Sequence, residues 1–124
     1  MLDLIIKNGQ CYIDGELKNV DVAVKDGKIQ HIGKISEKAK DLLDTKGLTV
    51  LPGCIDTQTH FREPGSTDTE DLHSGSRAAI TGGITGVFEM PNTNPPTSTK
   101  KEFQKKLDLA KNRMYCNYAF YFGA

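Results

Sequence analysis

The side chains best suited to chemistry lie in residues 51–62, which read LPGCIDTQTHFR. Within this run, Gln58, His60 and Arg62 are spaced by two. In an extended strand such residues project from the same face, so we expect these side chains to converge on one space, with Asp56 on the same side. Polar groups are costly on a buried strand unless they bind something. The spacing therefore favours a binding site, and a polar pair satisfied by its own hydrogen bonds is the alternative.

Positions 58 and 60 are typical of half a metal site. Two histidines at this spacing form a common pair of metal ligands, but here the first position holds Gln58. Zinc prefers imidazole, thiolate or carboxylate ligands, whereas the amide oxygen of glutamine is neutral and weakly donating. His60 is therefore the candidate metal ligand of this run.

A second polar cluster follows a second apolar segment, at residues 92–94. The pattern around it predicts strands, helices and loops in alternation. The expected order is strand 54–60, loop 61–68, helix 69–79, strand 84–90, loop 91–96, helix 99–112 and strand 115–122. Such an order predicts a parallel α/β sheet with right-handed connections, whose ligands bind at the carboxyl ends of the strands. Both polar clusters fall at those ends, so two separate stretches point to one site, and this favours an enzyme.

The first 50 residues read as β-structure. A hairpin is predicted over residues 20–33, where VAVKDGKIQHIG places Asp-Gly between two alternating runs. A further short strand is predicted at 44–50, after a polar, lysine-rich loop. We assign residues 1–51 to a β-domain and 52–124 to an α/β domain. His31, His73 and the lysines of helix 99–112 are interpreted as structural or solvated side chains.

The composition excludes several classes of protein. The 124 residues include 16 basic and 16 acidic side chains, so no basic excess suggests nucleic acid as a partner. No apolar stretch approaches the roughly 18 residues of a membrane span, and the N-terminus does not read as a signal peptide, which favours the cytoplasm. The three cysteines are far apart and odd in number, so we expect free thiols that are buried or partly buried.

Two stretches carry a family resemblance. LPGCIDTQTHFREPG and TEDLHSGSRAAITGGITGVFEMPNTNPP resemble dihydroorotases of the amidohydrolase superfamily, and the likeness covers essentially the whole chain. HFREPG and EMPNTNPP are its most specific parts. In the similar allantoinases and dihydropyrimidinases the corresponding segment does not read MPNTNPP, and for this reason dihydroorotase is preferred here.

The resemblance implies a fold and a reaction. The fold would be a β-sandwich segment (1–51) followed by the first three strands of a truncated (β/α)8 TIM barrel (52–124). The reaction would be the reversible, metal-assisted hydrolysis of dihydroorotate to N-carbamoyl-L-aspartate in pyrimidine biosynthesis. One or two zinc ions would be the cofactor, lowering the pKa of bound water and polarising the ring carbonyl.

The resemblance also implies roles for single residues. His60 matches the second histidine of the family's D-x-H-x-H motif, and Gln58 stands where the first would be, which predicts a weakened, single-metal or inactive site. Arg62 and Asn92 match the residues that bind the substrate carboxylate, a role that suits a guanidinium and an amide. The family's catalytic aspartate would lie beyond Ala124. No catalytic residue is therefore expected within these residues, and we expect them to be inactive alone.

Three further expectations concern partners and alternatives. Because a full barrel takes about 250 residues, the sheet would have open edges, and we expect another chain to cover them. We also expect a homodimer. The alternatives are an allantoinase- or hydantoinase-type hydrolase, and a non-catalytic scaffold, for example for aspartate transcarbamoylase, which Gln58 favours.

Overall fold

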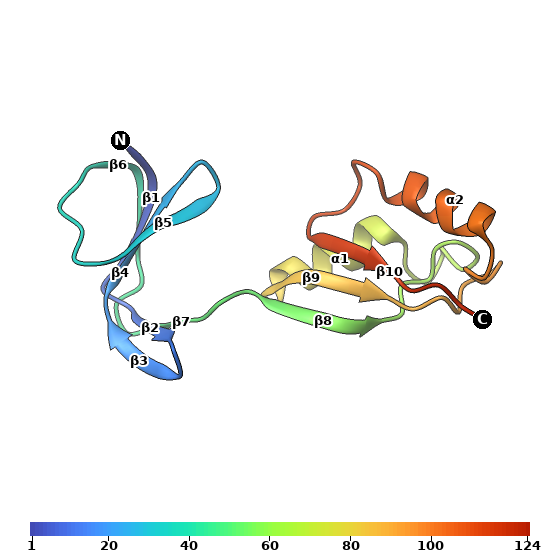
Figure 1. Ribbon diagram of the computed structural model, residues 1–124, viewed down its shortest axis with the longest axis horizontal. Helices are drawn as coiled ribbons and strands as arrows, with labels where there is room; N and C mark the ends of the chain where they lie inside the picture. Colours follow the sequence, from blue (N-terminus) through green and yellow to red (C-terminus); the bar gives the residue numbers. More distant parts are fainter. The chain divides into compact units, whose positions relative to one another are not determined.

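The computed structural model describes residues 1–124, which divide into two compact units. We call Met1–Pro52 the N-terminal unit and Gly53–Ala124 the C-terminal unit, and describe each by itself (Figure 1). Neither helix of the chain has the length and apolar character needed to cross a bilayer.

The N-terminal unit consists of β-strands. They are β1 (Leu2–Lys7), β2 (Gln10–Ile13), β3 (Glu16–Asn19), β4 (Asp21–Lys25), β5 (Lys28–Gly33), β6 (Ala39–Asp44) and β7 (Thr49–Val50). One sheet has the order β5-β4-β1-β6 and the other the order β3-β2-β7. β1 is central to the larger sheet, because it pairs antiparallel with β4 and parallel with β6. Leu2, Ile5 and Ala23 form the buried core of this sheet.

The hairpin predicted at residues 20–33 is confirmed, since β4 and β5 pair antiparallel. Its turn residues Asp26 and Gly27 have φ values of 52° and 70°, the left-handed pair that suits the twist of a tight hairpin. The strand predicted at 44–50 is confirmed only at its end, where β7 covers Thr49–Val50. Residues 45–48 form a turn closed by a 2.9 Å hydrogen bond from Leu48 N to Thr45 O, and β6 lies where the sequence predicts a loop.

The C-terminal unit alternates strands and helices. Its elements are β8 (Cys54–Thr59), α1 (Leu72–Thr81), β9 (Ile84–Glu89), α2 (Lys100–Ala110) and β10 (Asn117–Phe120). The sheet order is β10-β9-β8, and both pairings are parallel, as the directions of the three arrows show (Figure 1). The predicted parallel α/β arrangement is therefore confirmed, with element ends displaced by a few residues.

Local capping explains where the two helices begin. The carboxylate of Asp71 accepts a 2.6 Å hydrogen bond from the backbone of Ser74, and the Ser74 hydroxyl accepts one of 3.1 Å from the backbone of Asp71. This reciprocal capping box starts α1 three residues later than the predicted Thr69, which lies in a turn. Thr99 caps α2 by accepting a hydrogen bond of 3.2 Å from the backbone of Glu102.

A small apolar core joins the helices of this unit to its sheet. It consists of Phe61, Leu72, Val87, Ala110 and Cys116. Val87 is fully buried, whereas its neighbour Phe88, which strand alternation places on the opposite face, remains 39% exposed. All three cysteines are free thiols as predicted, although Cys54 is exposed rather than buried.

Candidate functional site

Parallel pairing brings the carboxyl ends of β8 and β9 together. β8 ends at Thr59 and β9 at Glu89, and these two residues are partners in the register. Immediately beyond them, Met90 N donates a hydrogen bond of 2.9 Å to Thr59 O. The two polar clusters predicted from the sequence therefore leave the sheet side by side.

His60 and Asn92 form the centre of the candidate site. His60 follows β8 directly and is half-buried, and its Nδ1 lies 2.9 Å from Oδ1 of the exposed Asn92. With the Asn92 oxygen as acceptor, Nδ1 carries the proton and Nε2 keeps its lone pair. Such a contact fixes the tautomer and orientation of an imidazole that is to bind a metal or take a proton.

The other residues of the first cluster do not join this contact. The strand ends at Thr59, so regular alternation does not extend to Arg62, whose exposed guanidinium forms no ion pair. Gln58 lies on β8 with its side chain exposed. The expected convergence is wrong for Asp56. Its Oδ1 accepts a hydrogen bond of 2.9 Å from the backbone of Gln58, so the carboxylate is bonded within β8.

Two loops beyond the strand ends support this centre. Asn94 N donates to Pro64 O at 3.0 Å, which ties the loop after β9 to the loop after β8. Gly65 makes the close approach possible: its φ is 116°, and a Cβ there would lie 2.6 Å from Asn94 O. A larger residue at Gly65 would therefore push the loops apart.

A buried carboxylate anchors the first of these loops. Glu63 accepts hydrogen bonds of 2.7 and 3.0 Å from the two terminal nitrogens of Arg113, and one of 2.9 Å from Leu72 N at the start of α1. The hydrogen bonds to Glu63 raise the pKa of Arg113, and nearby Asp71 adds to this. The bidentate geometry gives the strongest form of such a pair.

A second buried pair lies at the end of β9, and the sequence reasoning missed it. Lys106 Nζ donates to Glu89 Oε2 at 2.6 Å, and both side chains are almost fully buried. Burial raises the pKa of Glu89 to about 7, against the hydrogen bond and charge of Lys106 and the charge of His60, which lower it. The interpretation of the α2 lysines as solvated is therefore wrong for Lys106. The signal was its spacing of three after Phe103 and four before Ala110, which places it on the apolar stripe of the helix.

The residues present do not make a zinc site by themselves. The chain contains no group of three or more His, Cys, Asp or Glu side chains that could hold a metal ion. The donors at the strand ends are one imidazole, His60, and one amide, Gln58, whereas a catalytic zinc site uses three protein ligands of the imidazole, thiolate or carboxylate type.

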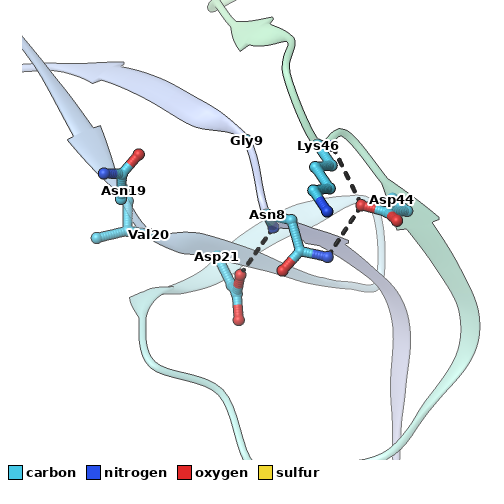
Figure 2. A pocket seen from close by; sticks show the side chains of 7 residues that line it. All are labelled: Asn8, Gly9, Asn19, Val20, Asp21, Asp44 and Lys46. Atoms are coloured by element: carbon cyan, nitrogen blue, oxygen red, sulfur yellow. Dashed lines mark hydrogen bonds between the residues drawn. The ribbon is translucent and has the colours of Figure 1, made fainter.

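A pocket of about 530 Å³ belongs to the N-terminal unit, whereas His60 and Asn92 belong to the C-terminal unit. Figure 2 shows hydrogen bonds that join Asn8, Asp21, Asp44 and the backbone of Lys46 in its wall. Asn8 donates from its backbone to Asp21 at 3.3 Å and from its side chain to Asp44 at 2.9 Å, and Asp44 also accepts a hydrogen bond of 3.1 Å from Lys46 N. The hydrogen bonds of Asn8, Asp21 and Asp44 are thus made within the chain, which indicates a structural role for these side chains.

Comparison with known sequences identifies the type of protein. A profile of the amidohydrolase family matches residues 49–123. Allantoinase of Escherichia coli O1:K1 / APEC is 47% identical over 113 residues, which are 90% of this chain and 25% of that protein. Allantoinase of Salmonella choleraesuis is 46% identical over the same lengths. The chain thus spans about a quarter of the length of the curated relatives it matches.

Solved structures give the same picture for the fold. L-hydantoinase (dihydropyrimidinase) from Arthrobacter aurescens matches with a TM-score of 0.89 and 32% identity, over 99% of this chain and 28% of that one. D-hydantoinase (dihydropyrimidinase) from Thermus sp. matches with a TM-score of 0.81 and 27% identity, over 98% of this chain and 27% of that one. The expected fold is confirmed: a sheet-rich N-terminal segment precedes the first strands of a TIM barrel.

Proposed function

The chain belongs to the amidohydrolase family, and from this premise we propose that the protein containing it opens a cyclic amide ring of the allantoin or hydantoin type by hydrolysis. The observation that carries the proposal is the identity of 47% to an allantoinase over 113 residues. The likeness to L-hydantoinase, at 32% identity, supports the same class of substrate. In this reaction water adds to a ring carbonyl, the ring C–N bond breaks, and the nitrogen takes up a proton as a carboxylate forms.

The residues of this chain have positioning and binding roles in this proposal. Asn92 holds the His60 ring through Nδ1, which leaves Nε2 free to face the reacting group. Arg62 is exposed two residues beyond His60 and presents an uncommitted positive charge to a substrate oxygen. The group that transfers the proton would lie outside these residues, and zinc as the cofactor is part of the proposal, with its other ligands also outside them.

Dihydroorotate is the second candidate substrate. The MPNTNPP segment and Arg62 favour it, because dihydroorotate carries a carboxylate that a guanidinium can pair with, whereas the allantoin and hydantoin rings carry none. The identities to allantoinases and hydantoinases weigh against it as the first choice.

A non-catalytic role is the alternative of another class. Gln58 supports it, since an amide at this position weakens metal binding. A scaffold for aspartate transcarbamoylase, a homodimer and a cytoplasmic location stay predictions, as does the covering of the open sheet edges by another chain.

The test compares three substrates in an assay of the natural, full-length protein that contains these residues. Ring opening of allantoin, a 5-substituted hydantoin and dihydroorotate is followed by chromatography, with zinc supplied. We expect turnover of allantoin or hydantoin. Turnover of dihydroorotate alone would favour the second candidate, and no turnover of any ring would favour the scaffold.

Two variants control for enzymes carried over from the expression host. His60→Ala should abolish turnover, because it removes the imidazole at the centre of the site. Lys40→Ala should leave turnover unchanged, because Lys40 lies in the N-terminal unit and pairs only with Asp3 at the surface. Activity that survives in His60→Ala would belong to the host.

A further inference from the structure

The buried pair of Glu89 and Lys106 is bonded to the backbone that leads to Asn92. Besides its 2.6 Å hydrogen bond to Glu89 Oε2, Lys106 Nζ lies 3.4 Å from the carbonyl oxygen of Met90. One ammonium on α2 therefore holds two consecutive residues at the end of β9. Its own position is fixed by burial and by the Phe120 ring, whose centroid lies 5.5 Å away.

The same two residues are also fixed to the neighbouring strands. Tyr121 N donates to Glu89 O at 2.9 Å, and Met90 N donates to Thr59 O at 2.9 Å. Thr59 directly precedes His60, and only Pro91, with its fixed φ, separates Met90 from Asn92. The Glu89–Lys106 pair thus holds a short stretch of backbone that leads directly to Asn92.

Stability alone does not account for this pair. Removing two charges from water costs several kcal/mol, and a buried ion pair offsets this only when its remaining polar atoms are also bonded. Here Glu89 Oε1 is buried without a hydrogen-bond partner. Two apolar side chains of similar size would fill the same space without this cost, but they would tolerate sliding of α2 along β9, which a directed hydrogen bond does not.

We propose that Glu89 and Lys106 are positioning residues, which hold the end of β9 in the register that places Asn92 against His60. The consequence for catalysis rests on the proposed function, whereas the consequence for geometry does not. Both side chains are buried, and the pair acts through the Met90–Asn92 backbone that Lys106 contacts.

The main test replaces the pair in the natural protein by apolar residues of similar volume, as Glu89→Leu/Lys106→Met. Crystal structures of the wild type and the double variant give the distance from His60 Nδ1 to Asn92 Oδ1. We expect this distance to lengthen beyond hydrogen-bond range while the fold is kept. With the substrate that the wild type turns over, we expect kcat to fall about 10- to 100-fold with little change in KM, the effect of a misplaced group near the reacting centre.

Two further variants keep the test decisive. Lys40→Met removes an ion pair of the same length, 2.6 Å, at the surface, and it should change neither the distance nor kcat. Should the double variant fail to fold, Lys106→Met alone is crystallised at pH 5.5, where Glu89 is neutral and tolerates the loss of its partner. The same lengthening is expected there.

The outcomes separate the two proposals. A wild type that opens no cyclic amide would contradict the proposed function, and the crystallographic distance would still decide the role of the pair. An unchanged distance from His60 to Asn92 in the double variant, or in Lys106→Met, would overturn the positioning role whatever the activity.

Discussion

Oδ1 of Asn92 lies 2.9 Å from Nδ1 of His60, so one hydrogen bond joins the loops that follow two neighbouring parallel strands. The two residues are 32 positions apart in the chain, and β8 and β9 bring them together. The bond links His60, which can act on a substrate, to Asn92, which fixes the orientation of the His60 ring.

Loss of this hydrogen bond should lower turnover. Asn92→Ala frees the His60 ring to rotate, and we expect kcat to fall about 10- to 100-fold, as for other residues that orient a functional histidine. Steady-state kinetics with the natural protein measures this. Asn94→Ala is the matched control, because it keeps the Cβ that lies against Gly65. Equal losses in the two variants would mean that the loop, and not the Asn92 side chain, is responsible.

Arg62 distinguishes the candidate substrates. If it pairs with a carboxylate, Arg62→Ala removes a charge-assisted interaction of about 2–3 kcal/mol, which raises KM for dihydroorotate about 30- to 150-fold. KM for allantoin or hydantoin, which lack the carboxylate, should change much less. Arg77→Ala, an exposed arginine on α1, is the control. A rise of the same size for every ring would show that Arg62 recognises something the substrates share.

Gln58 can be tested by restoring the imidazole. Gln58→His places a second ring two residues before His60, and we expect the natural protein to retain more zinc after dialysis, measured by elemental analysis. Thr57→His is the control, since it adds the same imidazole at a spacing of three from His60 instead of two. Unchanged zinc in Gln58→His would mean that position 58 does not face a metal.

Gly75 is expected to tolerate no side chain. It lies buried in α1, and a Cβ would lie 2.6 Å from the ring of Phe61, which follows His60 in the chain. Overpacking of this kind costs about 1–3 kcal/mol, more than the roughly 1 kcal/mol that alanine adds to a helix. Gly75→Ala should therefore lower Tm, and Phe61→Leu in the same chain should restore part of it. A higher Tm in the single variant would contradict the close packing.

The buried Glu89 predicts a dependence of stability on pH. Because burial raises its pKa from 4.5 to about 7, the folded protein holds this proton more tightly than the unfolded chain does. The stability contributed by neutral Glu89 is fully present below pH 4.5 and is lost as the pH rises through 7. The free energy of unfolding of the wild type minus that of Glu89→Gln should therefore fall across this window, by about 3 kcal/mol. Denaturant unfolding at several pH values measures it, and a constant difference would contradict the raised pKa.

Local patterns predicted much of the fold because short-range chemistry determines those parts. The hairpin of β4 and β5 depends on Asp26-Gly27, and the order of strands and helices after residue 53 follows from periodicity. β6 was missed for a physical reason. Its leucines, Leu42 and Leu43, are 67% and 50% exposed, and the strand is held by pairing with β1, more than 30 residues earlier. No local pattern contains that pairing.

The candidate site was predicted in part. The meeting of the two polar clusters follows from the rule that parallel strands end at one edge, and His60 and Asn92 obey it. The supporting pairs were not foreseen, because a buried Lys106 or Glu63 has a partner that only the tertiary structure supplies. Strand alternation also does not predict that β8 ends before His60, or that the register between β8 and β9 shifts after Asp56.

The central place of β1 has a consequence for how the chain is made. Its two partners, β4 and β6, lie downstream, so the larger sheet of the N-terminal unit cannot close until the ribosome has released residue 44. Until then the apolar residues of β1 stay exposed to solvent. Deletion of residues 2–7 would not remove an edge strand: it would divide the sheet and leave the β4–β5 hairpin and β6 without their common neighbour.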